Sequence, residues 1–168
     1  THRLSSAASD VYKRQPEVVD LVACLRKMGA KIFGEGTDRI EINGVNALEP
    51  CDYSVMADRI EIGTYLTAVT MTKGNVSIKC SLPSVLETIL DKLKIAGANI
   101  QINEEGINLE MDKIPNPVNI STAPFPLFPT DMQAQFIALN SISNGKSKVI
   151  ENVFENRFMH VQLSLIHI

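Results

Sequence analysis

Apolar residues recur at helical spacing in four segments of the chain, and each segment leads into one or two short strand patterns. The first begins at Pro16 and Glu17, which suit the first turn of a helix, and its apolar face continues to Gly29. Gly29 is placed to end this helix in a left-handed conformation. Residues 30–33 then read as a strand, and 39–42 alternate as the returning strand of a hairpin.

The same plan recurs further along the chain. A helix that ends at Gly97 is followed by strands over 98–102 and 107–111, as in the first copy. Helices of a second kind, over 59–71 and 131–143, alternate with the first kind, and each leads into one strand. The repeating unit is therefore helix, strand, helix, strand, strand, which indicates stacked copies of one α/β unit.

The composition is that of an ordinary globular protein. Of the 168 residues, 45% are hydrophobic and 21% are charged, so the chain can bury a sizeable core. The formal net charge is −3, there is no basic stripe, and the chain contains no Trp. A nucleic-acid partner is therefore not expected, because such a partner needs a basic patch or aromatic platforms for the bases.

The cysteines give no sign of a metal site. Cys24, Cys51 and Cys80 are odd in number and widely spaced, with no Cys-x-x-Cys pair, so neither a zinc site nor a disulfide framework is indicated. A reducing cytoplasm is the simplest compartment for such a chain. No apolar run approaches the roughly 20 residues of a membrane span, so no membrane partner is expected.

Two segments near the C-terminal end carry the candidate chemistry. Residues 128–135 read Phe-Pro-Thr-Asp-Met-Gln-Ala-Gln, and residues 153–160 read Val-Phe-Glu-Asn-Arg-Phe-Met-His. Both put charged groups where a loop or strand meets a helix, which is where ligands bind in α/β folds. Together they resemble the UDP-N-acetylglucosamine 1-carboxyvinyltransferases of the enolpyruvyl transferase family, and the resemblance covers residues 16–161.

Periodicity alone gives an α/β fold with short antiparallel hairpins. The resemblance implies the inside-out α/β barrel of the enolpyruvyl transferases, in which helices are buried, sheets face solvent, and two hinged domains enclose the active site. It assigns 16–55 to the end of the first barrel domain and 56–161 to part of the second. Residues 1–15 and 162–168 do not match and are expected to be non-native flanks. The alternative is a natural disordered arm and a short terminal strand.

Asp131 is the best candidate for a catalytic group. Its place at the start of a predicted helix is fully explained by helix capping. The other interpretation is a base, because a helix N-terminus favours an ionised carboxylate, which can accept a hydroxyl proton. In the resembled enzymes the matching Asp contacts the 3-hydroxyl of the N-acetylglucosamine ring. It is their proposed proton acceptor as that hydroxyl attacks phosphoenolpyruvate, and the resemblance favours this role here.

Four further residues are candidates for substrate binding. The resemblance implies that Val153 holds the nucleotide sugar through its backbone and that Phe154 walls the sugar pocket; the alternative is the end of a buried strand. Arg157 either faces the carboxylate or phosphate of phosphoenolpyruvate or pairs on the surface with Glu155. The resemblance places Asp58 beside the hinge and phosphoenolpyruvate, whereas its spacing alone fits a solvated helix face.

The resemblance implies transfer of an enolpyruvyl group from phosphoenolpyruvate to the 3-hydroxyl of UDP-N-acetylglucosamine by a monomeric cytoplasmic bacterial enzyme, without a metal or cofactor. This reaction is the first committed step of peptidoglycan synthesis, and so serves cell wall biogenesis, cell shape and cell division. The family's Gly-rich loop with its reactive Cys or Asp is missing, so this chain by itself is predicted to be inactive. The alternatives are an enzyme like 5-enolpyruvylshikimate-3-phosphate synthase and a non-catalytic nucleotide-sugar-binding module.

Overall fold

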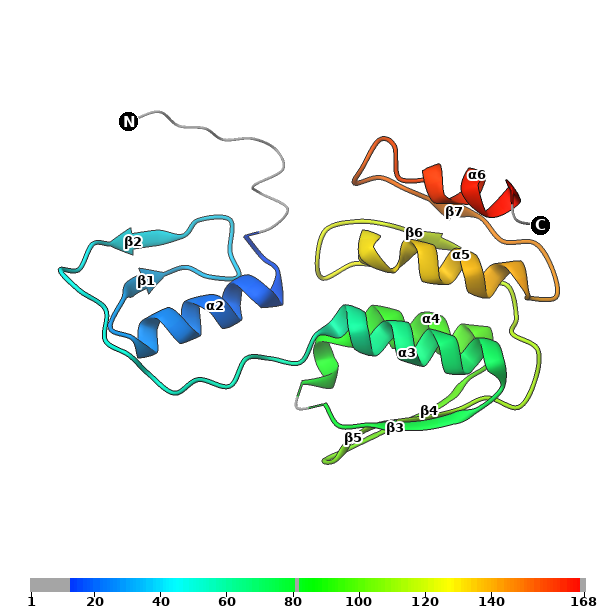
Figure 1. Ribbon diagram of the computed structural model, residues 1–168, viewed down its shortest axis with the longest axis horizontal. Coiled ribbons are helices and arrows are strands. Elements are labelled where there is room, and N and C mark those ends of the chain that lie inside the picture. Colours follow the sequence, from blue (N-terminus) through cyan, green and yellow to red (C-terminus); the bar gives the residue numbers. More distant parts are fainter. Residues whose placement is uncertain (1–12, 81, 167–168) are drawn as a thin grey trace. The chain divides into compact units, whose positions relative to one another are not determined.

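The computed structural model describes residues 13–80 and 82–166, and the chain divides into two compact units between Met56 and Ala57 (Figure 1). The domain boundary expected from the sequence falls one residue earlier, and the assignment of the units to two barrel domains stays a prediction. The first unit contains α2 (Pro16–Lys27), β1 (Lys31–Phe33) and β2 (Glu41–Asn43).

Helix α2 begins and ends as its sequence predicts. Pro16 occupies the first helical turn, where its missing N–H is not needed, and Glu17 places a negative charge at the positive end of the helix dipole. Gly29 follows the helix with a φ of 99°, a left-handed conformation that a residue without a Cβ adopts easily. Val22 on α2 and Ile32 on β1 are each 4% exposed, whereas Val19 of the predicted apolar face is 38% exposed, so this face is buried only in part.

The second unit begins with a complete copy of the predicted repeat. Its order is helix, strand, helix, strand, strand, as the periodicity predicts. The elements are α3 (Arg59–Thr72), β3 (Asn75–Ile78), the 3-10 helix η1 (Pro83–Leu86), α4 (Glu87–Ala96), β4 (Asn99–Asn103) and β5 (Gly106–Glu110). β5 returns between β3 and β4 and pairs antiparallel with both, so β3 and β4 run parallel on the two edges of the sheet.

The rest of the second unit is a β-α-β arrangement followed by a helix. The elements are β6 (Ile120–Ser121), the 3-10 helix η2 (Thr130–Met132), α5 (Gln133–Ser141), β7 (Val149–Ile150) and α6 (Met159–Ile166), and β6 and β7 pair in parallel. The prediction of a short strand over 162–168 is wrong for the described part of that segment, because α6 is helical.

Residues 1–12 and 167–168 lie outside the described residues, so the expectation of non-native flanks stays a prediction. No helix in the described ranges is long and apolar enough to cross a membrane.

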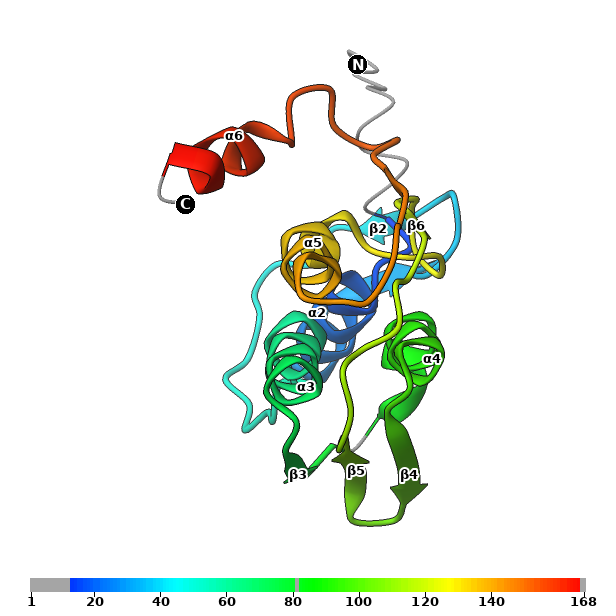
Figure 2. The same ribbon diagram turned by 90° about the vertical axis from the view of Figure 1, so that its right-hand side faces the viewer.

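Helices lie at the centre of the second unit. Figures 1 and 2 show α3 and α4 together on one face of the β3-β5-β4 sheet, with α5 on the side of these helices away from the sheet. The rings of Phe128 and Phe136 meet edge to face, with their centroids 5.0 Å apart. The side chains that join the helices are fully buried: Leu66, Leu86, Ile89, Leu93, Phe136 and Leu139. Burial of helices behind a sheet is the arrangement expected of the inside-out barrel.

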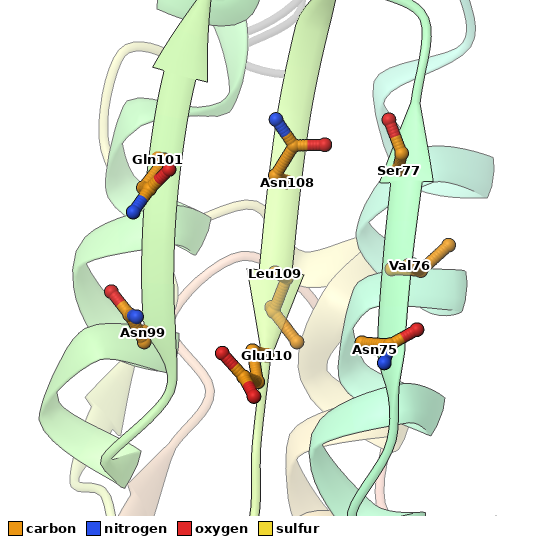
Figure 3. A pocket seen from close by; sticks show the side chains of 8 residues that line it. All are labelled: Asn75, Val76, Ser77, Asn99, Gln101, Asn108, Leu109 and Glu110. Atoms are coloured by element: carbon orange, nitrogen blue, oxygen red, sulfur yellow. The ribbon is translucent and has the colours of Figure 1, made fainter.

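The outer face of the β3-β5-β4 sheet is polar. Figure 3 shows amide, hydroxyl and carboxylate side chains side by side on this face, around a shallow hollow of about 330 Å³. They come from alternate positions of the three strands, because successive side chains of a strand point to opposite faces: Asn75, Ser77, Asn99, Gln101, Asn108 and Glu110. Since the opposite face packs on the helices, the sheet has one apolar and one polar side. None of the predicted site residues lines this hollow.

Substitution of Gly106 by Ala is expected to destabilise the second unit by about 1–3 kcal/mol, the usual size of local backbone strain. Gly106 opens β5 with a φ of 141°, and a Cβ there would overlap the carbonyl oxygen of Ile78 and lie 2.8 Å from the amide nitrogen of Cys80. Gly74→Ala is the matched control, because its Cβ would make only an ordinary contact, 3.5 Å from Val69 Cγ1. Urea unfolding measures both variants, and equal midpoints would contradict this account of the hairpin.

Candidate functional site

A single carboxylate, that of Glu151, organises the loop that follows β7. Its Oε1 accepts hydrogen bonds from the hydroxyl of Thr122 at 2.8 Å and from the backbone N–H groups of Val153 at 2.9 Å and Phe154 at 3.1 Å. The N–H of Asn152 donates in turn to the Thr122 hydroxyl at 2.9 Å. Glu151 therefore fixes the backbone of the first two residues of the second predicted motif.

The other oxygen of Glu151 holds the start of the first motif helix. Oε2 accepts from the hydroxyl of Thr130 at 2.9 Å and from the side-chain amide of Gln133 at 3.2 Å. Thr130 opens η2, and Gln133 is the first residue of α5 and only 1% exposed. One side chain thus ties together two segments that are distant in the sequence, and Asp131 lies between its two partners in the first segment.

Hydrogen bonding lowers the pKa of Glu151 below the ordinary value of 4.5. Burial acts in the opposite direction, since it disfavours the charged form. The donors outweigh burial: the N–H of Val153, the hydroxyls of Thr122 and Thr130, and the N–H of Phe154 all stabilise the carboxylate. Glu151 is therefore an anion at neutral pH, and its role is to accept hydrogen bonds rather than to exchange protons.

Asp131 and Arg157, one from each motif, form an ion pair at this site. Arg157 Nη2 donates to Asp131 Oδ1 at 2.7 Å, the length of a strong charge-assisted hydrogen bond. The two side chains are 47% and 32% exposed respectively, so a ligand can reach the pair. The guanidinium also lies over the ring of Phe154, 5.1 Å from its centre. The structure thus brings together three of the five predicted site residues: Asp131, Phe154 and Arg157.

Two local interpretations from the sequence are wrong. Asp131 does not cap a helix: it lies inside η2, and neither η2 nor α5 has a side-chain cap, because the carboxylate binds Arg157 instead. For the same reason Arg157 is not the partner of Glu155 among the described residues. The helix predicted from residue 131 is α-helical only from Gln133. These differences leave the Asp131 carboxylate facing a cation rather than its own backbone.

Val153 and Phe154 do not end a buried strand. β7 ends at Ile150, and the Phe154 side chain is 43% exposed. The N–H of Val153 is already donated to Glu151, so any backbone contact of Val153 with a ligand must use its carbonyl oxygen. In the backbone contact that the sequence predicts, Val153 would therefore accept a hydrogen bond from a hydroxyl or N–H group of the ligand.

Asp58 has a capping role at the start of α3. Its Oδ1 accepts from the N–H of Ile60 at 2.8 Å and of Glu61 at 3.1 Å, which satisfies two donors of the first helical turn. The helix it caps is joined to the motif helix by Gln135, whose amide donates to the Thr64 hydroxyl at 2.9 Å. No hydrogen bond or ion pair described in the structure joins Asp58 to Asp131 or Arg157, and its role beside a substrate stays a prediction.

A known family matches almost the whole chain. The family model described as EPSP synthase (3-phosphoshikimate 1-carboxyvinyltransferase) matches residues 5–164, so the chain belongs to this family of enolpyruvyl transferases. Among the described residues there is no group of three or more His, Cys, Asp or Glu side chains that could hold a metal ion.

One solved structure shows the same fold. The enolpyruvyl transferase NikO from Streptomyces tendae superimposes with a TM-score of 0.73 and 23% identity, over 90% of this chain and 37% of that one. This match confirms the α/β fold of enolpyruvyl transferase type that the sequence predicts. An EPSP synthase from Acinetobacter baumannii gives a TM-score of 0.46 and 14% identity, over 83% of this chain and 33% of that one. The chain therefore spans about a third of the length of each of these structures.

The sequence interpretation missed Glu151, whose partners come from residues 122, 130, 133, 153 and 154. A signal existed, because Glu151 stands directly after a strand and just before the second motif. An acidic residue at that place is more often solvated, however, and the donors that surround it come from separate segments. Only the fold brings them together.

Glu151→Gln is expected to destabilise the second unit by about 1–3 kcal/mol near neutral pH, because an amide –NH2 would face donors that then lose their acceptor. The lowered pKa of Glu151 sets the pH dependence. Its stabilising contribution is fully present above the unfolded-state pKa, the ordinary value of 4.5, and is lost as the pH falls through the lower folded-state pKa. The difference between wild type and variant should therefore shrink in acid.

Urea unfolding at neutral and at acidic pH measures this difference. Glu155→Gln is the matched control, because Glu155 is exposed and its charge is removed in the same way. A Glu151→Gln difference that stays constant from neutral to acidic pH would show that the carboxylate does not hold the loops as described.

Proposed function

We propose that the full-length protein transfers the enolpyruvyl group of phosphoenolpyruvate to the 3-hydroxyl of UDP-N-acetylglucosamine. Membership of the enolpyruvyl transferase family supports the class of reaction. The two motif segments support this acceptor. The observation that carries the proposal is the accessible ion pair of Asp131 and Arg157, one residue from each motif. The reaction would serve peptidoglycan synthesis, and so cell wall biogenesis, in a bacterial cytoplasm.

Asp131 is the proton acceptor in this proposal. Attack of a hydroxyl group on the enol carbon needs a base within hydrogen-bond reach of that hydroxyl. Oδ1 of Asp131 is bound to Arg157, whereas Oδ2 accepts no hydrogen bond from the described residues. The carboxylate is also about half exposed. It can therefore receive a sugar hydroxyl on Oδ2 while Arg157 still holds it in position.

Arg157 is the cationic group for phosphoenolpyruvate. Its planar guanidinium suits the carboxylate or the phosphate of this substrate, and Phe154 supports one side of the plane. Only Nη2 of Arg157 binds Asp131, so the other N–H groups of the guanidinium can bind a substrate anion while the ion pair stays in place.

Shikimate 3-phosphate is the alternative acceptor, and the description of the matching family model favours it. The two acceptors need different binding groups from the protein. A nucleotide sugar has a diphosphate and a base to be bound, whereas shikimate 3-phosphate has a compact phosphate ester. The thermal midpoint of the full-length protein with each compound separates them. A rise with UDP-N-acetylglucosamine alone supports the proposal, and a rise with shikimate 3-phosphate alone contradicts it.

A non-catalytic nucleotide-sugar-binding module is the second alternative. It would give the same shift with UDP-N-acetylglucosamine but no release of phosphate from phosphoenolpyruvate. Turnover by the full-length protein therefore decides between these two functions. The present chain alone, which spans 37% of the length of NikO, is expected to show no turnover.

Asp131→Asn in the full-length protein is expected to lower kcat by about 10²–10⁴, the usual contribution of a positioned general base. The amide keeps the shape of the side chain but cannot accept the proton. Asp91→Asn is the matched control, because Asp91 also forms an exposed ion pair, with Lys94 at 3.2 Å, outside the site. Steady-state phosphate release measures both variants. A kcat equal to that of wild type in Asp131→Asn would remove the proposed role.

Arg157→Lys is expected to raise the KM for phosphoenolpyruvate by roughly 10- to 100-fold, which corresponds to about 1.5–3 kcal/mol for a lost charged hydrogen bond. The ammonium group keeps the charge but loses the planar fork. The KM for the nucleotide sugar should change much less. A larger effect on the nucleotide sugar than on phosphoenolpyruvate would place Arg157 on the acceptor instead.

A further inference from the structure

Residues 49–53 of the first unit lie along α2 and run in the opposite direction to the helix. At one end, the N–H of Glu49 donates to the carbonyl oxygen of Met28 at 2.8 Å. At the other end, the hydroxyl of Tyr53 donates to Asp20, at 2.8 Å to Oδ1 and 3.0 Å to the carbonyl oxygen. The segment is therefore attached to the helix at both ends.

Cys24 lies at the midpoint of residues 20–28 of α2 and the turn after it, and Cys51 lies at the midpoint of residues 49–53. From Asp20 to Met28 a helix rises about 12 Å, and four residues of extended chain span about 13 Å, so the two midpoints fall side by side. Cys24 is four residues from both Asp20 and Met28, and so lies on the same helical face. Cys51 is also one of the groups that raise the pKa of the Cys24 thiol, which agrees with this placement. Thiols far apart in the sequence thus become neighbours.

The surroundings keep Cys24 protonated. Burial raises the pKa of its thiol, the neighbouring Cys51 raises it further, and the carboxylate of Asp20 adds to this, while Lys27 acts in the opposite direction. Because the thiolate is the reactive form, exchange with an oxidant is slow near neutral pH and faster at higher pH. Both thiols are free and half-buried, so a small molecule can reach them, whereas Cys80 is buried.

The geometry points to a redox-sensitive pair: Cys24 and Cys51 form a reversible disulfide when the chain meets a low-molecular-weight disulfide such as oxidised glutathione. One protein thiolate attacks a sulfur of glutathione disulfide, breaks its S–S bond and releases one reduced glutathione. The second protein thiolate then attacks the mixed disulfide and releases the other. Two protein thiols are oxidised, one small disulfide is reduced to two thiols, and the two protons pass to the leaving thiolates.

The bond would join the 49–53 segment covalently to α2. The hydrogen bonds of Glu49 and Tyr53 already hold the two cysteines together in the reduced chain, so the disulfide adds to existing contacts. The segment leads to the division between the units after Met56. Oxidation therefore restricts the chain where it leaves the first unit. This proposal does not depend on the reaction that the second unit serves.

Intact mass and peptide mapping test the proposal on the whole 168-residue chain. The chain is incubated with oxidised glutathione at mildly alkaline pH, and its free thiols are then alkylated under denaturing conditions. We expect a product about 2 Da lighter than the reduced chain before alkylation, because two thiol hydrogens are lost. Trypsin should release peptides 15–26 and 40–59 joined by a disulfide, with Cys80 alkylated.

Three controls make the outcome decisive. Cys80→Ser should still form the bond, whereas Cys51→Ser should not and should leave Cys24 alkylated or carrying glutathione. The wild-type chain oxidised in denaturant should give mixed pairs that include Cys80. Glutathione on both Cys24 and Cys51, or the same mixture of pairs in the folded and denatured chains, would overturn the proposal. Reduction with dithiothreitol should restore the original mass, and a failure to do so would overturn reversibility.

Discussion

The candidate site depends on a carboxylate that takes no part in the proposed chemistry. Glu151 accepts five hydrogen bonds from three segments of the chain, and two of these segments are the two motifs. Without an acceptor at this place, the partly buried donors of Thr130 and Val153 would lose their partner, which is costly. The ion pair of Asp131 and Arg157 then follows, because the backbone on both sides of it is fixed.

The fold explains why such an anchor is needed. The helices of the second unit pack on one face of the β3-β5-β4 sheet, and the two motifs lie in the segments that lead into α5 and out of β7. β6 and β7 are only two residues long and give these loops little support of their own. Side-chain hydrogen bonds to Glu151 supply the support for the loops that the short strands do not. The match to NikO shows that this is the fold of an enolpyruvyl transferase.

Local patterns predicted the elements well, because helix faces and glycine positions are set by neighbouring residues. The copy from α3 to β5 and the left-handed glycines at 29 and 97 are examples. Contacts between distant residues were not predictable from spacing. Asp131 read locally as a helix cap, yet its partner Arg157 follows 26 residues later. Cys24 and Cys51 looked unrelated for the same reason, although the fold makes them neighbours.

The most direct test of the account is a crystal structure of the full-length protein with UDP-N-acetylglucosamine bound. The account predicts that the 3-hydroxyl of the sugar lies within hydrogen-bond distance, about 2.6–3.2 Å, of an Asp131 carboxylate oxygen. The carbonyl oxygen of Val153 should face the same ligand. A nucleotide sugar bound with its 3-hydroxyl away from Asp131, against other residues, would contradict the central claim.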